Sequence, residues 1–252
     1  MEKSVVSLKA AANLFRMHGN TYPGRIIILG TSQDGKCAVQ GYVIMGRGKD
    51  SRNRRFNNEE GRLFTEAANP AEMKDPSLII YDAMAETNGY FIVSNGDQTG
   101  TVASVLSVAK TDLTSALMER TFEPDPPRTP RITGCHFIEN GQVYLSVLSI
   151  LRRAEMPGED SCERFSFQYD TITPGFGMCI STYDGDGNPL PSFSGVPYIM
   201  PLYGDIIDVS SLYWEALNPD NKVALAVKFI EIATGKSEIK IINKYTKVEP
   251  KV

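Results

Sequence analysis

The sequence predicts an α+β protein in which antiparallel sheets are covered by helices. Three observations predict this class: many short runs of β-branched and aromatic residues, turn signals such as Asn140-Gly141 between successive runs, and a few segments with helical spacing. Strands joined by short turns pair as antiparallel neighbours, and helices then cover the faces of the sheets. The 252 residues, 42% of them hydrophobic, are enough to bury a sizeable core in one domain.

The amino-terminal segment has the spacing of a short amphipathic helix from about Ser4 to Met17. Its apolar residues recur at steps of three and four, at Val5, Leu8, Ala12 and Phe15. We interpret this helix as an appendage. The expected organisation is therefore an N-terminal helical extension in residues 1–20 and a single domain in residues 21–252.

The domain is expected to consist mainly of strands. Short β-branched or aromatic runs bounded by turn residues predict strands at 26–30, 37–45, 77–82, 90–97, 132–138, 143–151, 164–169, 177–183, 222–232 and 238–244. One long helix is expected from Gln98 to about Thr121, where apolar residues recur at helical steps. The proline-rich segment 123–131 is expected to be a stiff connector, because proline fixes φ and cannot continue a helix.

Composition and charge exclude several classes of protein. A net charge of -4 argues against a nucleic-acid-binding protein, which would need a broad basic face. The four cysteines lack C-x-x-C spacing and are expected to be reduced, mostly buried thiols. No apolar run approaches the length of a membrane span, and polar residues interrupt the amino-terminal segment where a signal peptide would be apolar. We expect a cytoplasmic protein without membrane contact.

Two candidate ligand patterns are better explained as structural. Asp184-Gly185-Asp186-Gly187-Asn188 is similar to the start of a calcium loop, but an EF-hand needs Gly at the sixth position and Glu at the twelfth. Pro189 and Gly195 occupy those positions, so we expect a hairpin turn. His18 and His136 are too few and too scattered for a usual zinc site or a Ser-His-Asp triad. We expect neither a metal nor a cofactor.

A basic segment from Met45 to Phe56 is the strongest functional signal. Gly46 and Gly48 allow a backbone amide to approach a ligand closely, and arginine offers paired planar donors that match phosphate oxygens. A solvated basic turn is the alternative, because most charge runs lie on the surface. The order Arg52-Asn53-Arg54 favours recognition of a polar, anionic small molecule.

Five blocks in one order resemble the archaeal-type inosine monophosphate (IMP) cyclohydrolase family, over roughly residues 22 to 247. The blocks are Tyr22-Pro23-Gly24-Arg25, Met45-Gly46-Arg47, Ser51-Arg52-Asn53-Arg54, Ser94-Asn95-Gly96-Asp97-Gln98-Thr99 and Glu123-Pro124-Asp125-x-Pro127-x-Thr129-Pro130-Arg131. The resemblance implies an Ntn-hydrolase-like αββα sandwich of two antiparallel sheets. It also implies ring closure of 5-formamidoimidazole-4-carboxamide ribonucleotide (FAICAR) to IMP, a purine ribonucleotide partner and a homo-oligomer.

The resemblance places substrate-binding residues on the matching blocks. These residues are Arg25, Arg47, Asn53, Arg54, Thr129 and Arg131. Arg25, Arg47 and Arg54 are candidates for a phosphate clamp, with Arg131 as a fourth member or as the partner of the catalytic base. Which of them contacts phosphate stays open.

Ring closure needs an acceptor for the amide proton and a donor to the formyl oxygen. Tyr81, Asn95 and Glu123 are the candidate catalytic residues: Tyr81 as the donor, Asn95 to hold the carboxamide, and Glu123 as the base if a dry pocket raises its pKa. Tyr81 is alternatively a strand residue that only packs. For Asp97 the favoured interpretation is a helix N-cap.

Two other functions stay open. An Ntn-type amidohydrolase would need a processed N-terminal nucleophile, which only cleavage before Thr21 would provide. A non-catalytic purine nucleotide-binding protein would keep the arginines without turnover.

Overall fold

Two antiparallel sheets face each other in the computed structural model, which describes residues 3–59, 62–109, 111–156 and 160–248. The six-stranded sheet contains, in spatial order, β11 (Tyr198–Pro201), β10 (Phe176–Ser181), β1 (Arg25–Thr31), β2 (Cys37–Met45), β12 (Lys222–Glu231) and β13 (Ser237–Asn243). The seven-stranded sheet contains β3 (Arg55–Glu59), β4 (Arg62–Glu66), β5 (Asp82–Thr87), β6 (Tyr90–Ser94), β7 (Arg131–Glu139), β8 (Gln142–Arg153) and β9 (Cys162–Tyr169).

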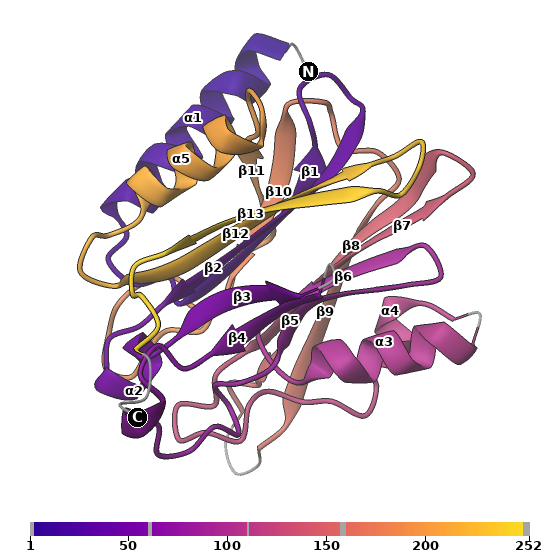
Figure 1. Ribbon diagram of the computed structural model, residues 1–252. Coiled ribbons are helices and arrows are strands. Elements are labelled where there is room, and N and C mark those ends of the chain that lie inside the picture. Colours follow the sequence, from indigo (N-terminus) through magenta and orange to yellow (C-terminus); the bar gives the residue numbers. More distant parts are fainter. Residues whose placement is uncertain (1–2, 60–61, 110, 157–159, 249–252) are drawn as a thin grey trace.

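Helices cover the outer face of each sheet, which gives four layers (Figure 1). Helices α1 (Lys3–Gly19) and α5 (Ile206–Ala216) lie on the six-stranded sheet, and α3 (Gln98–Val108) and α4 (Leu113–Ala116) lie on the other. A short helix α2 (Lys49–Arg52) and a 3-10 turn (Pro70–Glu72) lie in connections at one end of the molecule. The expected α+β class with two helix-covered antiparallel sheets is confirmed.

The layers are held together by cores on both faces of the sheets. In β1, Ile27 and Leu29 point between the sheets, whereas Ile26 and Ile28 pack under the helices α1 and α5. This double burial explains why β1 reads as a continuous apolar run instead of alternating. None of the described helices is long and apolar enough to cross a membrane.

The tight turn between β7 and β8 is formed by the residues from which it was predicted. Asn140 and Gly141 both have positive φ, 50° and 72°, as the tight turn between β7 and β8 requires. The four cysteines are free; Cys135 and Cys179 are buried, and Cys37 and Cys162 are partly exposed.

Several predicted elements were wrong or missing. The long helix at 98–121 ends at Val108, and Asp112, whose side chain accepts from Ser115 N at 3.0 Å, starts the separate short helix α4. The strand predicted at 77–82 is mostly a turn, in which Ile80 N donates to Pro76 O, and β5 begins only at Asp82. Strands β3, β4 and β11 and helix α5 were not predicted from the sequence.

The extension does form a helix, but its apolar stripe does not face the sheet. Leu8 and Phe15 are 71% and 77% exposed, and Val5 is also exposed. The buried face instead carries Ala10, Asn13 and Met17, and the Asn13 amide donates to Ile199 O of β11 at 2.7 Å. The stripe at steps of three and four therefore marks the outward face of α1.

Candidate functional site

Two buried arginines meet between the sheets at the end where β1 begins and β2 ends. Arg25 is paired with Ile44 in the antiparallel register, and its side chain is nearly buried. Its Nη2 atom lies 4.0 Å from Glu123 Oε2, and its buried Nε has no hydrogen-bond partner in the described part of the chain. Burial alone would lower the pKa of Arg25, but Glu123 and then several tyrosines raise it overall. Arg25 is therefore a fixed cation with unused donor capacity.

The basic segment turns Arg54 inward. Arg54 is 1% exposed, and its guanidinium donates to Ser51 O at 3.0 Å and to Met45 O at 3.5 Å. Burial and then the charge of Arg25 lower the pKa of Arg54. Two buried guanidiniums that repel one another form a site that an anion would stabilise.

Glu123 is the carboxyl group beside this pair. It is 2% exposed, and burial raises its pKa to about 7 although Arg25 opposes the shift. Its backbone N–H donates to Thr129 O at 2.8 Å, which closes the proline-rich loop around it. A carboxyl group with this pKa can both accept and donate a proton near neutral pH.

Asn95 positions that carboxyl. Its Nδ2 donates to Glu123 Oε1 at 3.2 Å and to Pro130 O at 2.9 Å. Its Oδ1 accepts from Gln98 Nε2 and Ile132 N, so all the usual bonds of this amide are made within the chain. The side chain predicted to hold a substrate carboxamide is thus engaged in holding Glu123.

Tyrosine hydroxyls line the same region. Tyr81, directly after the 77–80 turn, shares a 2.7 Å hydrogen bond with Tyr42 on β2. Tyr183 bonds Thr129 Oγ1 at 2.8 Å and stacks on Tyr22 with 6.0 Å between ring centroids. Burial raises the pKa of Tyr183 to about 12 and that of Tyr42 well above its usual value. These two hydroxyls therefore stay protonated and can donate.

Tyr22, Tyr42 and Tyr183 were not among the residues predicted for the site. Tyr42 and Ile44 lie two residues apart on β2, so both side chains point to the same face, which is the inner one. The sequence does not show which face of the strand is inner. Tyr22 lies in the block that precedes Arg25, which was the available signal for it.

Arg131 and Thr129 frame the site from the proline-rich loop. Arg131 Nη1 donates to Asp97 Oδ1 at 2.5 Å and to Gln98 Oε1 at 2.7 Å. Asp97 occupies the predicted N-cap position of α3, but its side chain makes no capping bond and instead forms ion pairs with Arg120 and Arg131. Thr129 Oγ1 donates to Asp125 Oδ2 at 2.5 Å, so the loop carries its own internal bonds.

Two predicted residues are not brought into the buried cluster. Arg47 is 40% exposed, forms an ion pair with Asp186 and lies over the Tyr22 ring at 4.9 Å, so it borders the cluster from outside. Asn53 clamps the loop: its Nδ2 donates to Asn69 O at 2.9 Å, and its Oδ1 accepts from Asn69 N at 2.6 Å. Asp186, the ion-pair partner of Arg47, lies in the segment 184–188, where a hairpin turn was predicted.

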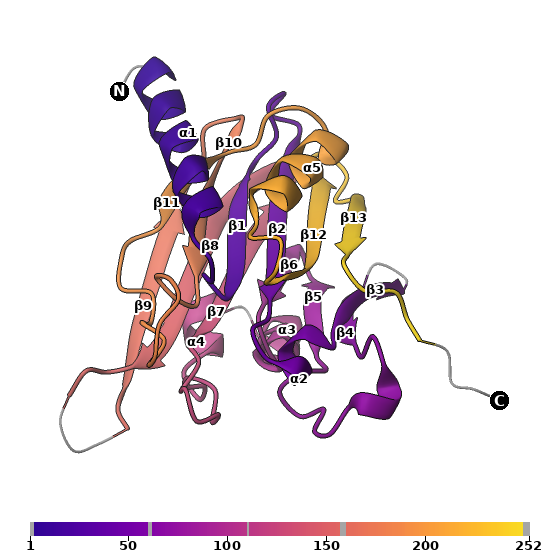
Figure 2. The ribbon, with the colours of Figure 1, turned by 90° about the vertical axis from the view of Figure 1, so that its left-hand side faces the viewer.

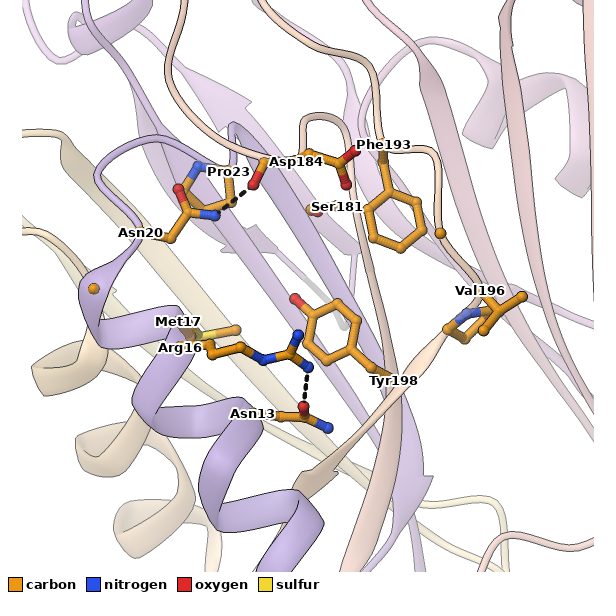
Figure 3. A pocket seen from close by; sticks show the side chains of 13 residues that line it. Asn13, Arg16, Met17, Asn20, Pro23, Ser181, Asp184, Phe193, Val196 and Tyr198 are labelled. Carbon is orange, nitrogen blue, oxygen red and sulfur yellow. Dashed lines mark hydrogen bonds between the residues drawn. The ribbon is translucent and has the colours of Figure 1, made fainter.

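A separate cavity of about 630 Å³ lies beside α1. Figure 3 shows Arg16 and Tyr198 on one side of it and Asp184 and Phe193 on the other. None of the nine predicted site residues lines this cavity. Within the described ranges, no three His, Cys, Asp or Glu side chains gather as a potential metal site.

The fold and this cluster define the class: an α+β sandwich of two helix-covered antiparallel sheets, with two buried arginines and a buried carboxyl between the sheets. The chain belongs to the family described as IMP cyclohydrolase-like protein, which matches residues 22–236. The resemblance found in the sequence is thereby confirmed.

One curated relative is the IMP cyclohydrolase of Methanothrix thermoacetophila, with 29% identity over 116 residues. That alignment covers 45% of this chain and 56% of the relative, so the chain matches little more than half of the relative's length.

Proposed function

We propose that this protein is an IMP cyclohydrolase, which closes FAICAR to IMP with loss of water. The observation that carries the proposal is the pair of buried guanidiniums, Arg25 and Arg54, beside a carboxyl group whose pKa is about 7. Family membership and the curated IMP cyclohydrolase support it. The same proposal takes the four layers as an Ntn-hydrolase-like αββα sandwich and residues 21–252 as one domain.

The arginines hold the anionic ribonucleotide in this proposal. Arg54 binds the 5′-phosphate, because its nearest protein partners are carbonyl oxygens rather than a carboxylate. Arg25 lies between that charge and Glu123, and Arg47 contributes from the rim. Asn53 and Thr129 act by holding the loops that carry these groups.

Ring closure then needs positioning and two proton transfers. The carboxamide nitrogen forms a bond to the formyl carbon and loses one proton, while the formyl oxygen gains a proton and becomes a hydroxyl. In the second step the C–O bond breaks, a ring nitrogen loses a proton, and the hydroxyl leaves as water. Glu123 carries the proton between nitrogen and oxygen, Asn95 holds Glu123, and Tyr81 donates to the oxygen.

The test is an absorbance assay of purified protein with FAICAR that follows purine formation. Conversion confirms the activity, whereas tight binding of IMP without conversion would identify a non-catalytic nucleotide-binding protein. An intact-mass measurement is run beside it. A chain that begins at Thr21 after maturation would favour the Ntn-type amidohydrolase instead.

A further inference from the structure

The outer helix layer carries an apolar stripe that the described chain leaves uncovered. Val5, Leu8, Ala12 and Phe15 occupy α1 at steps of three, four and three residues, the spacing of a packed helix seam. Leu8 and Phe15 are the most exposed large apolar side chains of this layer. The stripe lies opposite the face on which Ala10, Asn13 and Met17 pack onto the sheet.

The two helices of this layer carry opposite charges. The described part of α1 contains Lys3, Lys9, Arg16 and His18 and no acidic residue, whereas α5 contains Asp208 and Glu215 and no basic residue. Figures 1 and 2 show the two helices together on the same face. Lys9, Arg16, Asp208 and Glu215 are exposed and take part in none of the ion pairs of the described residues.

The basic residues border the stripe on the side away from α5. Lys9 and Arg16 each follow a stripe residue by one position, and Arg16 donates to Asn13, which is bonded to β11. On the other side, Tyr203 Oη, just before α5, donates to Ser7 Oγ at 3.4 Å. The face therefore runs in the order acidic α5, apolar stripe, basic border.

We infer that this face binds a second copy of the chain. A two-fold axis that runs along α1 places stripe on stripe and exchanges the two sides, so each acidic α5 lies over the basic border of the partner. An axis across α1 would instead bring α5 onto α5 and oppose like charges. The charge order thus selects both the partner, which is an identical chain, and the parallel arrangement of the two α1 helices.

The first test measures the dissociation constant by analytical ultracentrifugation for the full chain and for Leu8→Glu/Phe15→Glu. The wild type is expected to be a dimer at micromolar concentration, and the variant to bind about tenfold or more weakly. Both side chains are more than two-thirds exposed, so the variant chain should still fold, and any fall in its thermal midpoint should be only the concentration-dependent part that dimerisation contributes. The matched control is Val108→Glu/Met118→Glu, two exposed apolar residues of the opposite layer, which should stay dimeric.

The second test reverses the charges. Lys9→Glu/Arg16→Glu makes the border acidic, and Asp208→Lys/Glu215→Lys makes α5 basic, so each variant alone should dimerise weakly. An equimolar mixture of the two should regain the dimer, because the acidic border of the first variant then meets the basic α5 of the second, and the acidic α5 of the first meets the basic border of the second. If the two variants have different thermal midpoints, the mixture is measured again at a temperature below the lower midpoint.

Several results would overturn the inference. They are a monomeric wild type, a stripe variant as dimeric as the wild type, a control that loses the dimer equally, or a mixture that stays monomeric. Binding to phosphatidylserine vesicles by a monomeric wild type, lost in the stripe variant, would assign the face to a membrane surface instead.

Discussion

At the scale of single residues, the fold shifts the pKa of the Glu123 carboxyl group into the range that proton transfer at neutral pH requires. Its burial raises the pKa to about 7, and Arg25, Arg54 and Arg131 keep it from rising further. A carboxyl group in this range gives nearly equal access to both proton states at neutral pH. It can therefore take a proton from nitrogen and return it to oxygen within one reaction.

Replacing Glu123 by Gln is expected to lower turnover about 10²–10⁴-fold, because the amide keeps the shape but cannot move a proton.

The same substitution also tests the raised pKa of Glu123 through the pH dependence of the free energy of unfolding. The ordinary pKa of 4.5 is raised in the folded state, so the stabilisation is complete below pH 4.5 and is lost as the pH rises through about 7. The total loss is about 3 kcal/mol. Urea unfolding between these pH values should show this slope in the wild type and a flatter one in Glu123→Gln; parallel slopes would contradict the raised pKa.

Tyr81→Phe is expected to reduce turnover more than substrate affinity, because the ring still packs while one donor to the formyl oxygen is lost. The loss is about 2.7 to 4 kcal/mol in transition-state stabilisation if the hydroxyl acts there. Tyr42→Phe is the comparison, since it removes the other half of the 2.7 Å hydroxyl pair. Steady-state kinetics of both variants give the changes in kcat and KM. An unchanged kcat in Tyr81→Phe would mean that Tyr81 only packs.

Arg54 is expected to bind phosphate through its paired planar donors. Arg54→Lys keeps the charge but loses this geometry, so IMP affinity should fall, and Arg54→Ala should lose more. Titration of IMP and of inosine into the three proteins separates the effects, because inosine has no phosphate. Equal affinities in all three, or equal losses for IMP and inosine, would remove Arg54 from the phosphate site.

At the scale of elements, the backbone of the loop between β2 and β3 is closely packed at Gly46. A Cβ atom on Gly46 would lie 2.6 Å from Ser51 O, the carbonyl that accepts from Arg54 Nε. A Cβ atom on Gly48 would meet only Ser51 Oγ at 3.8 Å, an ordinary contact. The two glycines of the basic segment therefore have different roles, although both were predicted to let a ligand approach.

Gly46→Ala should move the loop and weaken IMP binding by about tenfold, because the 2.6 Å contact is with backbone and Arg54 is bonded to the same carbonyl. Gly48→Ala is the matched control and should bind IMP as the wild type does. Calorimetric titration of the two variants provides the measurement. Equal affinities would show that this carbonyl does not set the position of Arg54.

Physical reasons explain why some elements could not be predicted from the sequence. Strands β3 and β4 contain mostly Arg, Asn and Glu and bury only a few residues such as Phe56, Leu63 and Thr65, so their sequences show no clear alternation of apolar and polar residues. The apolar run at 78–80 resembled a strand, but the Pro76 carbonyl accepts from Ile79 and Ile80 and closes a turn. Local pattern cannot foresee such tertiary choices.

At the scale of the whole molecule, the candidate site joins segments that are distant in the chain. Arg25, Arg54, Asn95 and Glu123 were predicted from motif blocks, and Tyr81 was predicted from its residue type on an expected strand. The structure gathers all five at one end of the sandwich. Their roles stay proposals. Arg47 was predicted with them but is drawn outward by Asp186, a partner 139 residues away that no local motif indicates.

Polar contacts near the other end of the sandwich fix how the two sheets face each other. Gln40 of β2 donates to Phe91 O of β6 at 2.8 Å, and His136 of β7 bonds Val39 O of β2 at 3.1 Å. Burial lowers the pKa of His136 to about 4, so the ring is neutral and its Nε2–H donates to the carbonyl. Each contact joins one sheet to the other, which limits sliding between the apolar faces.

An ion pair between Lys228 on β12 and Glu86 on β5 also joins the two sheets. The Lys228 side chain is fully buried and its Nζ lies 5.6 Å from the centroid of the Phe91 ring, whereas Glu86 is partly exposed. Glu86→Ala leaves a buried ammonium without its partner and should cost about 3 kcal/mol, near the lower limit for buried pairs. Adding Lys228→Met to that variant should restore much of the loss, because the charge is removed and an apolar chain fills the space. Urea unfolding of the two single variants and the double variant measures this coupling. A double variant no more stable than Glu86→Ala would mean that solvent already screens the pair.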